Sequence, residues 1–380
     1  MKLQRKNRRA LALGALAVSG ALALTACGSD NNNGSGAGSG NSSASAASNA
    51  GSIKCDNAKG QLLASGSTAQ QNAMALWAKN FMQACTGVQL NYKGVGSGAG
   101  IQEWLQGSTA FAGSDSPLKP EEIQQSKKNC SGGQGIDLPM VGGPISIIYN
   151  LPGVNDLVLD APTLAKIFNG KITKWDDEAI KKLNPTAKLP STAIQPFHRT
   201  EDSGTTDNFT KYLIAAAKSD WPYSGGKSWQ AKGGQSAKGS SGVAAGVKQT
   251  AGAIGYDELS YATSGNLQMA QLNTGASAPV KLTTDSASKA IADAKIVGVN
   301  GDLALKLNYA TKAEGAWPIV LVTSEIVCSK GNKADTLPAT KAFLSYIASE
   351  DAQSQLASMS YAPLPAEIAT KVRAAINSLS

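Results

Sequence analysis

The chain has 380 residues, of which 42% are hydrophobic and 16% charged, so it is predicted to be globular, with room for two domains, rather than disordered. Its formal net charge of +8 is concentrated at the N-terminus, where the first 26 residues include five basic residues and no acidic one. The remainder carries 30 basic and 27 acidic residues, a near balance that gives no reason to expect a nucleic-acid partner.

Residues 1–26 have the order of a signal peptide. A basic start precedes an apolar run of about 14 residues, too short to span a bilayer. The run ends at Leu24-Thr25-Ala26-Cys27, which resembles a bacterial lipobox. This resemblance implies that Cys27 becomes the lipidated first residue, carrying a palmitate-type anchor on the extracytoplasmic side of the cell membrane. Residues 27–52 are mostly Gly, Ser, Asn and Ala, a composition typical of a flexible tether.

Four cysteines remain in the predicted mature domain, at Cys55, Cys85, Cys130 and Cys328. An exported protein occupies an oxidising compartment, so this even number predicts two disulfides. Three pairings are possible, and the sequence leaves them open. A metal site is not expected, because the chain has no Cys-x-x-Cys pair and His198 is its single histidine.

Beyond the tether, short apolar runs alternate with amphipathic stretches, which predicts an α/β fold. We predict strands at residues 62–64, 88–92, 145–149 and 319–327, and helices near residues 74–81, 101–105, 162–168, 209–216, 340–349 and 366–379. Residues 194–197 form another apolar run, but Pro196 argues against a regular interior strand there.

Three places share one local design, in which a strand ends, a Ser/Thr/Gly cluster follows and a helix begins. They are Ser65 to Thr68, Gly96 to Gly98, and Ser203 to Thr205. The first N–H groups of a helix are unpaired and lie at the positive end of its dipole, so several such starts aimed at one point would hold an anion. Taken singly, each is explained as well by ordinary helix capping.

Two charged residues distinguish these places from ordinary caps. Arg199 lies four residues before Ser203, close enough to aim its guanidinium at the same helix start, which suits an oxyanion. Asp115 is a carboxylate that would repel an anion unless the anion carries a proton. Phosphate carries a proton at neutral pH and sulfate does not, so Asp115 favours phosphate. The alternative is that Asp115 is a solvated turn residue before Pro117.

Seven segments then carry a family resemblance. They are Ala64-Ser65-Gly66-Ser67-Thr68, Gly94-Val95-Gly96-Ser97-Gly98, Gly113-Ser114-Asp115-Ser116-Pro117-Leu118, Lys174-Trp175-Asp176-Asp177-Glu178-Ala179-Ile180, Arg199-Thr200-Glu201-Asp202-Ser203-Gly204-Thr205, Gly252-Ala253-Ile254-Gly255-Tyr256 and Ala316-Trp317-Pro318-Ile319. In this order and spacing, the chain from Leu62 to its C-terminus resembles the phosphate-binding lipoproteins of bacterial ABC phosphate importers. The resemblance implies a two-lobed α/β fold of the type II periplasmic-binding-protein kind, with a hinge and an interdomain ligand cleft. We expect lobe I at residues 53–143 plus 319–380 and lobe II at residues 144–318.

The resemblance also implies a set of site residues. Asp115 would accept the phosphate proton, Arg199 would make charged hydrogen bonds, and the other members would donate hydroxyl or backbone N–H groups. Many relatives have Phe where this chain has Ala69, a change that keeps the backbone N–H. The implied phosphate ligands are Thr68, Ala69, Ser97, Asp115, Arg199, Ser203, Gly204 and Thr205.

The resemblance implies a monomeric binding protein without a cofactor that delivers phosphate to an ABC permease in the membrane. One alternative is a binding protein for another tetrahedral oxyanion, such as sulfate, molybdate or arsenate. A secreted phosphatase is disfavoured, because the sequence shows neither a metal cluster nor a nucleophile with a matched base. A dinucleotide-binding enzyme is disfavoured too, although Gly94-x-Gly96-x-x-Ala99 fits the loose fingerprint, with Asp115 placed 21 residues after Gly94.

Overall fold

The computed structural model of this protein describes residues 53–380. The predicted signal peptide at residues 1–26, the lipidation site Cys27 and the tether at residues 27–52 lie outside these described residues. Among the helices of the described part, none is long and apolar enough to cross a bilayer.

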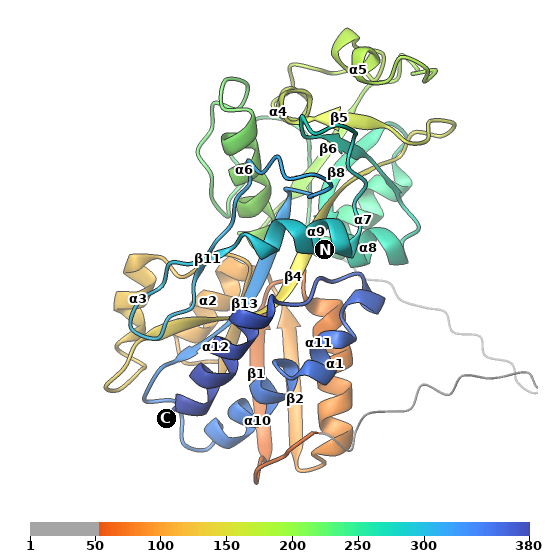
Figure 1. Ribbon diagram of the computed structural model, residues 1–380. Helices are drawn as coiled ribbons and strands as arrows, with labels where there is room; N and C mark the ends of the chain where they lie inside the picture. Colours follow the sequence, from red (N-terminus) through yellow and green to blue (C-terminus); the bar gives the residue numbers. More distant parts are fainter. Residues whose placement is uncertain (1–52) are drawn as a thin grey trace, which may run out of the picture. The chain divides into compact units, whose positions relative to one another are not determined.

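One mixed sheet of nine strands forms the frame of the described chain (Figure 1). Its strands follow the order β2-β1-β3-β13-β4-β8-β6-β7, and β9 pairs with β4 beside this path. The bounds of these strands are β1 Gly60–Gly66, β2 Val88–Gly94, β3 Phe111–Ser114, β4 Gly135–Tyr149, β6 Gln195–Arg199, β7 Gln235–Ala237, β8 Ala253–Glu258, β9 Gln268–Met269 and β13 Val320–Cys328.

Two short pairs of strands lie outside this sheet, and helices cover its faces. The short pairs are β5 (Val158–Asp160) with β10 (Gln271–Asn273), and β11 (Lys295–Ile296) with β12 (Leu305–Lys306). The helices are α1 Gln71–Ala84, α2 Ser97–Leu105, α3 Pro120–Ser126, α4 Ala161–Phe168, α5 Glu178–Leu183, α6 Gly204–Ala216, α7 Gly239–Gln249, α8 Leu259–Ser264, α9 Thr284–Ala292, α10 Leu337–Ile347, α11 Glu350–Ser354 and α12 Ala366–Ser378, with a 3₁₀ turn at Ala357–Met359.

The lower lobe in Figure 1 contains β1–β3, α1–α3 and α10–α12. Strand β1 pairs in parallel with β2 and β3, and α1 and α2 make the crossovers that parallel strands require. The predicted stripe of Met74, Trp77 and Phe81 is fully buried on α1. The ring of Phe81 packs edge-on against Phe343 of α10 at 5.3 Å between centroids, so the C-terminal helices complete the core of this lobe.

The upper lobe contains β5–β8 and α4–α7. Strand β6 lies between β8 and β7 and pairs in parallel with both. The expectation that Pro196 prevents a regular interior strand is therefore wrong. The proline is tolerated because β7 pairs with β6 only from Phe197 onward, so no ladder hydrogen bond to β7 is needed at Pro196.

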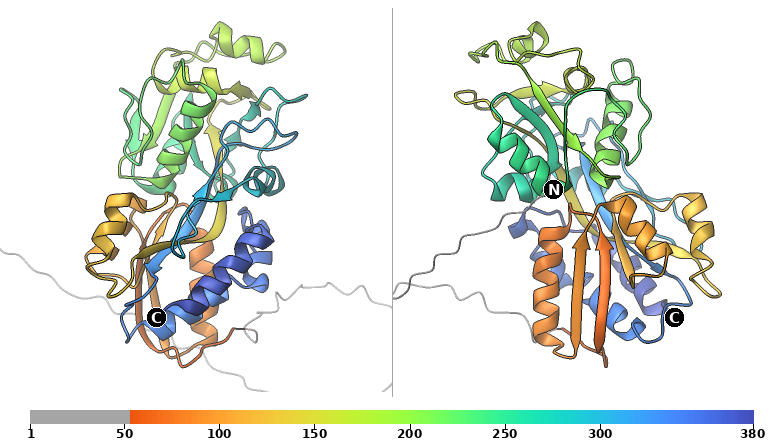
Figure 2. Two further views of the ribbon diagram at one scale, coloured as in Figure 1. Left: turned by 60° about the vertical axis from the view of Figure 1, so that its left-hand side comes forward. Right: turned by 180° about the vertical axis from the view of Figure 1, so that it is seen from behind.

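The two lobes are joined through the long central strands, and the views in Figure 2 show β4 and β13 running from one lobe into the other. Strand β4 pairs with β13 over residues 135–144 and with β8 from Ile145 to Tyr149. Every residue of β4 is buried, as is every residue of β13. A strand buried on both faces loses the polar alternation that would mark it in the sequence.

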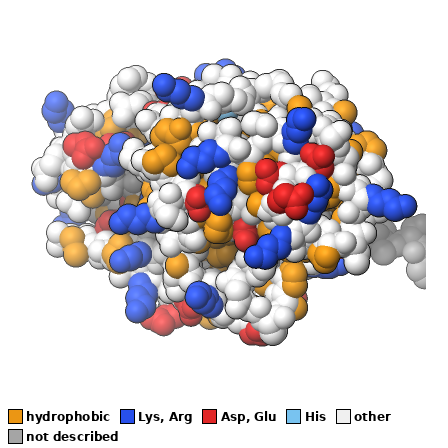
Figure 3. All heavy atoms as spheres, turned by 90° about the horizontal axis from the view of Figure 1, so that it is seen from above, with side chains coloured by type: hydrophobic (Ala, Val, Ile, Leu, Met, Phe, Trp, Pro, Cys, Tyr) orange, Lys and Arg blue, Asp and Glu red, His pale blue; other side chains and the backbone are white. Residues whose placement is uncertain are grey.

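The end of the upper lobe is covered by α4 and α5, and Figure 3 shows this face from above. Lysine and arginine side chains are spread over it, with acidic side chains between them. Ion pairs such as Lys166 with Asp220, at 3.7 Å, lie in this lobe. This distribution agrees with the near balance of charge calculated for the sequence beyond residue 26.

The four cysteines form two disulfides, as predicted, and the structure selects one of the three possible pairings. Cys55 pairs with Cys85 across the base of α1, a separation of 30 residues. Cys130 pairs with Cys328, a separation of 198 residues. The first bridge therefore closes a local loop, whereas the second links the segment after α3 to the end of β13.

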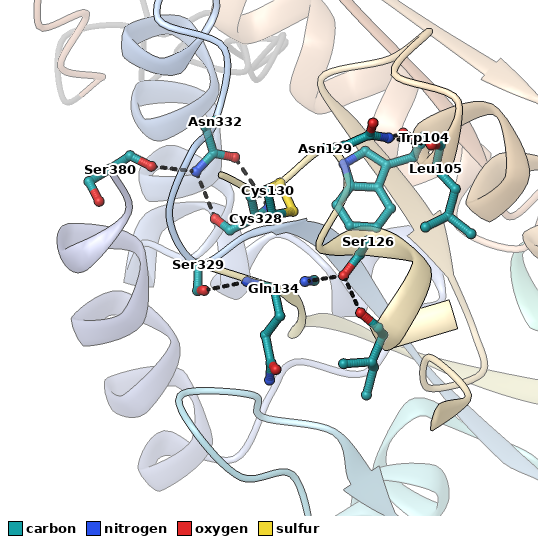
Figure 4. Close-up of a disulfide and its surroundings, with 12 residues drawn as sticks. Trp104, Leu105, Ser126, Asn129, Cys130, Gln134, Cys328, Ser329, Asn332 and Ser380 are labelled. Atoms are coloured by element: carbon teal, nitrogen blue, oxygen red, sulfur yellow. Dashed lines mark hydrogen bonds between the residues drawn. A yellow bond between two sulfur atoms is a disulfide. The ribbon is translucent and has the colours of Figure 1, made fainter. Parts of the chain in front are cut away.

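The C-terminus lies beside the second bridge (Figure 4). The side-chain amide of Asn332 donates to the backbone oxygen of Cys328 at 2.7 Å and to that of Ser380 at 3.1 Å. These hydrogen bonds hold the end of α12 against the turn that follows β13.

We expect loss of the Cys130–Cys328 bridge to destabilise the protein more than loss of the Cys55–Cys85 bridge. In the chain-entropy model, stabilisation grows with the logarithm of loop length, so separations of 198 and 30 residues differ by roughly 1.7 kcal/mol. Urea unfolding of the two double-serine variants measures this difference. A greater loss of unfolding free energy in the Cys55/Cys85 variant would contradict the prediction.

Candidate functional site

The three predicted strand-to-helix junctions, at Ser65 to Thr68, Gly96 to Gly98 and Ser203 to Thr205, all form at the carboxyl ends of strands. Ser65 to Thr68 connect β1 to α1, Gly96 is the residue before α2, and Ser203 is the N-cap of α6, where its side chain accepts from the N–H of Thr206. Gly96 has a φ of 93°, a backbone conformation that glycine adopts readily. Since β1, β2 and β6 belong to one sheet, its topology brings the three helix starts to one place.

The predicted site residues are all buried, and several contact one another across the two lobes. Arg199 donates from Nη2 to Thr68 Oγ1 at 2.8 Å and from Nη1 to Thr205 Oγ1 at 3.4 Å. Arg199 is only 2% exposed, so its charge acts in a weakly screened environment. The buried set consists of Thr68, Ala69, Ser97, Asp115, Arg199, Ser203, Gly204 and Thr205.

Asp115 directly follows β3 and is held by hydroxyl donors on both carboxylate oxygens. Ser97 donates to Oδ2 at 3.2 Å, and Thr323 of β13 donates to Oδ1 at 2.7 Å. Burial raises the pKa of Asp115, while hydrogen bonds from Ser67, Thr323 and Ser97 and the charge of Arg199 oppose that rise. These donors favour a carboxylate, which is the form that can accept a proton from a ligand.

Gly204 allows the start of α6 to approach this carboxylate. A Cβ at Gly204 would lie 2.5 Å from Asp115 Cβ and 2.6 Å from Ser97 Oγ. Any side chain at this position would push the two lobes apart. The side chain of Asn208, one turn further along α6, donates to the backbone oxygen of Asp115 at 2.8 Å and secures the same contact.

The backbone N–H of Ala69, an implied ligand donor, already has a partner in this structure. It donates to Ser67 Oγ at 3.0 Å. The small Ala69 side chain is fully buried in the main core cluster, and Tyr361 donates to its backbone oxygen. The packing beside Thr68 is therefore made by residues from the C-terminal part of the chain.

The comparisons with known proteins agree with this geometry. A family model described as a PBP superfamily domain matches residues 42–351. Phosphate-binding protein PstS 3 of Mycobacterium tuberculosis is 44% identical over 378 residues, 98% of this chain and 99% of that protein. PstS 2 of the same organism is 42% identical over 380 residues, 99% of this chain and 100% of that protein.

The chain belongs to the PstS family, within the PBP superfamily. A more distant member, phosphate-binding protein PstS of Xylella fastidiosa, is 34% identical over 302 residues, 78% of this chain and 80% of that protein. Family membership thus rests on near full-length similarity.

Solved structures show the same two-lobed fold. A high affinity periplasmic phosphate-binding protein bound with phosphate aligns with a TM-score of 0.68 at 22% identity, over 83% of this chain and 93% of that chain. A phosphate-binding protein from Stenotrophomonas maltophilia aligns with a TM-score of 0.63 at 21% identity, over 83% and 94% of the two chains. At these identities the likeness concerns the fold alone.

In this PstS-family chain, the structure adds Glu201, which sequence reasoning did not single out. Arg199 donates from Nε to Glu201 Oε1 at 2.9 Å, and Nη2 also contacts this oxygen. Glu201 further accepts from the N–H of Gly239 at 3.1 Å. The carboxylate therefore fixes one edge of the guanidinium, while Nη1 and Nη2 face the hydroxyls. Its spacing of two residues from Arg199 is the signal that could have identified it.

Ser240 is a second missed member. Its N–H donates to Thr68 Oγ1 at 3.2 Å, and its own hydroxyl lies 3.1 Å from that oxygen in a further hydrogen bond. Lys238 connects β7 to α7, and α7 begins with Gly239 and Ser240. This segment therefore repeats the sequence of strand, Gly/Ser cluster and helix seen at the other three sites. The pattern of strand, Gly/Ser cluster and helix start would therefore also have identified Ser240.

His198 has a structural role in the upper lobe. Its ring stacks on Trp229 with 4.9 Å between centroids and an interplanar angle of 7°. Burial lowers the pKa of His198, which keeps the imidazole neutral near physiological pH. The histidine therefore supports the upper lobe behind Arg199.

Two cavities adjoin the buried cluster from outside. One, of about 530 Å³, has a lining that includes Gly98 and the charged residues Asp202 and Lys227. The other, of about 590 Å³, reaches Asp115 past Asn208 on α6. Arg199 lines neither cavity, so the guanidinium and its hydroxyl partners are enclosed between the lobes.

Proposed function

We propose that this chain binds inorganic phosphate between its lobes, through Thr68, Ala69, Ser97, Asp115, Arg199, Ser203, Gly204 and Thr205, and delivers it to an ABC permease. The chain is a binding protein rather than an enzyme, as are the relatives of its family by name. The single observation that carries the phosphate assignment is the position of Asp115, a buried carboxylate among donors.

The donors alone favour an oxyanion of any kind. Arg199 supplies a buried positive charge, and the starts of α2 and α6 supply N–H groups at the positive ends of helix dipoles. Hydroxyls can donate to any such ion. Asp115 changes this selectivity, because a fully deprotonated ion such as sulfate would place its negative oxygens against the carboxylate. A protonated phosphate would instead donate to Asp115.

The site draws on both lobes, which supports binding by closure. Thr68, Ser97 and Asp115 belong to the lower lobe, and Arg199 and the start of α6 belong to the upper lobe. A ligand held by both sets favours the closed arrangement, since its full set of contacts exists only there. We place the hinge near Gly143 and Pro318, so that lobe I comprises residues 53–143 plus 319–380 and lobe II residues 144–318. The change of β4 partner after Pro144 supports this division.

Calorimetry of the purified mature protein with phosphate and with sulfate tests the function. We expect tight phosphate binding and sulfate binding weaker by at least roughly a hundredfold, the loss expected when one buried charge is left facing a like charge. Equal affinity for the two ions would support the alternative of a general tetrahedral-oxyanion protein. Hydrolysis of an aryl phosphate by the same preparation would support a phosphatase instead.

We further propose that the protein is a monomer held at the outer side of the cell membrane by a lipid at Cys27. The lipobox-like sequence before Cys27 supports this assignment. In a bacterial host that processes lipoproteins, we expect the wild type in the membrane fraction and Cys27→Ala in the soluble or secreted fraction. Phosphate binding by the two forms should be equal, because 25 residues of sequence lie between Cys27 and residue 53, where the described chain begins. Equal membrane partition of both forms would contradict the anchor.

A further inference from the structure

Glu325 is a buried carboxyl group for which the proposed binding function gives no use. It lies in β13 with no exposed surface, and neither of its carboxyl oxygens has a hydrogen-bond partner among the described residues. Strand β13 pairs Glu325 with Gly113 of β3, two residues before Asp115. Thr323, which donates to Asp115, lies two residues before Glu325 and so on the same face of β13.

A neutral polar pair covers Gly113 opposite Glu325. A Cβ at Gly113 would lie 2.2 Å from Gln70 Nε2 and 2.5 Å from Tyr92 Oη. Gln70 donates to Tyr92 at 3.0 Å, and Tyr92 donates to the backbone oxygen of Ser67 at 2.9 Å. Through its pairing with Gly113, Glu325 lies beside this pair, on the strand that also carries the Thr323 donor to Asp115.

The donors determine which of the two carboxyl groups is ionised. Asp115 accepts hydroxyl hydrogen bonds on both oxygens, and its charge is favoured by Arg199. Glu325 has no hydroxyl donor, and the amide of Gln70 is the one neighbouring group that favours its charge, so burial disfavours the ionised form of Glu325 more than that of Asp115. Two nearby buried carboxyl groups also resist simultaneous ionisation, so the proton resides on Glu325 and the negative charge on Asp115.

We propose that Glu325 is the protonated partner of Asp115 and that its ionisation at alkaline pH weakens phosphate binding. This inference rests on the proposed function. A neutral Glu325 leaves a single carboxylate beside the anion, whereas an ionised Glu325 adds a second negative charge to a closed, weakly screened site. Glu325 thereby sets the upper pH limit of tight binding.

The direction of the pH effect follows from the raised pKa of Glu325. Burial raises the pKa of Glu325 to about 8, Gln70 opposes the rise, and Asp115 adds to it. The proton is present well below pH 8, and it is lost as the pH rises through about 8. Affinity is therefore lost toward alkaline pH, not toward acid.

Other titratable groups face this region and must be separated from Glu325. Tyr92 is the second neighbour, and burial together with Glu325 raises its pKa well above 10. Burial also raises the pKa of Asp257 to about 8, and Asp257 faces Arg199 from β8. Tyr261 lies on the same side, near Tyr92. Because Asp257 titrates in the same range, the test compares variants at each pH instead of relying on the wild type alone.

The test is calorimetric titration with phosphate between pH 6.5 and 9.5 for the wild type and Glu325→Gln. Glutamine keeps the shape of the side chain but is neutral throughout. We expect similar affinities near pH 6.5. Across the pH range, the affinity of the wild type should fall roughly tenfold more than that of Glu325→Gln, as expected if bound phosphate raises the pKa of Glu325 by about one unit. The ionisation of phosphate itself and of Asp257 affects both proteins alike.

Glu258→Gln is the matched control. Glu258 is also fully buried and its pKa is raised, but its side chain accepts from Ser260 of α8 rather than facing Asp115. We expect it to keep the pH profile of the wild type. Coincident profiles for the wild type and Glu325→Gln would overturn the proposal, as would an equal change in Glu258→Gln.

Carbon-13 NMR of labelled glutamate side chains gives an independent readout without phosphate. The signal that disappears in Glu325→Gln should have the chemical shift of a protonated carboxyl at pH 7. An ionised shift at pH 7 would overturn the proposal even if the variant folds poorly. If instead the wild type fails to bind phosphate at pH 6.5, the proposed function is wrong, which the calorimetry distinguishes from failure of the Glu325 inference.

Discussion

Arg199→Ala is expected to weaken phosphate binding by more than a hundredfold. Removing one partner from a buried, hydrogen-bonded set of charges costs about 3–5 kcal/mol, and each 1.4 kcal/mol is a factor of ten in affinity. The guanidinium contributes charge and also bridges Thr68 in the lower lobe to Thr205 in the upper lobe. Its loss removes attraction for the anion and a contact of the closed state. Calorimetry at neutral pH and low salt measures the change.

The chain offers a matched control for this substitution. Arg373 is the other arginine of the described residues, on α12, where it donates to the backbone oxygen of Ala348. We expect Arg373→Ala to lower stability slightly and leave phosphate affinity unchanged. Arg199→Lys should fall between the wild type and Arg199→Ala, because lysine keeps the charge but not the planar fork. Affinity in Arg199→Ala within tenfold of the wild type would remove Arg199 from the site.

A loss of folding is distinguishable from a loss of binding in these variants. Arg199→Ala leaves the carboxylates of Glu201 and Asp257 without their cationic neighbour, so the unfolding temperature should fall as well. The affinity is therefore measured only on protein whose thermal unfolding is cooperative. Arg199→Lys, which retains a cation beside Glu201, keeps the prediction testable if the alanine variant unfolds.

The parts of the site that the sequence predicts are those encoded locally. Ser65 to Thr68 and Ser203 to Thr205 are recognisable because a strand, a small polar cluster and a helix follow one another within about ten residues. Thr323 and Glu325 were missed because their strand reaches Asp115 only through sheet pairing across some 200 residues of chain. Sequence spacing carries no signal for such a contact.

The central strand β4 was likewise only partly predictable from the sequence. The sequence predicts a strand only at Ile145 to Tyr149, although β4 begins at Gly135. The first ten residues contain Pro139 and Gly142, which normally interrupt strands. The structure accommodates them because the β4–β13 register shifts beside Pro139, and Gly142 packs so closely against Ala362 that a Cβ would lie 3.0 Å from its side chain. Both reasons depend on distant residues.

Asp115→Asn is expected to lower the ratio of phosphate affinity to sulfate affinity by roughly a hundredfold. Phosphate loses the charged acceptor for its proton, a hydrogen bond to a charged group worth about 1.5–3 kcal/mol. Sulfate gains, because the negative charge that repelled it is removed. The two effects move the affinities in opposite directions, which distinguishes a role in selectivity from general damage to the site. Parallel titrations with both ions measure the ratio.

Asp207→Asn provides the comparison that tests this explanation. Asp207 is also a buried aspartate near the start of α6, but it accepts from Ser116 and pairs with Lys211. Its substitution also removes one negative charge, but from a residue that is not a proposed ligand of the ion. We expect weaker packing there with the phosphate-to-sulfate ratio preserved. If both variants lower the ratio equally, the selectivity arises from the net charge around the site. If only Asp115→Asn lowers it, the selectivity arises from a proton shared between Asp115 and the ion.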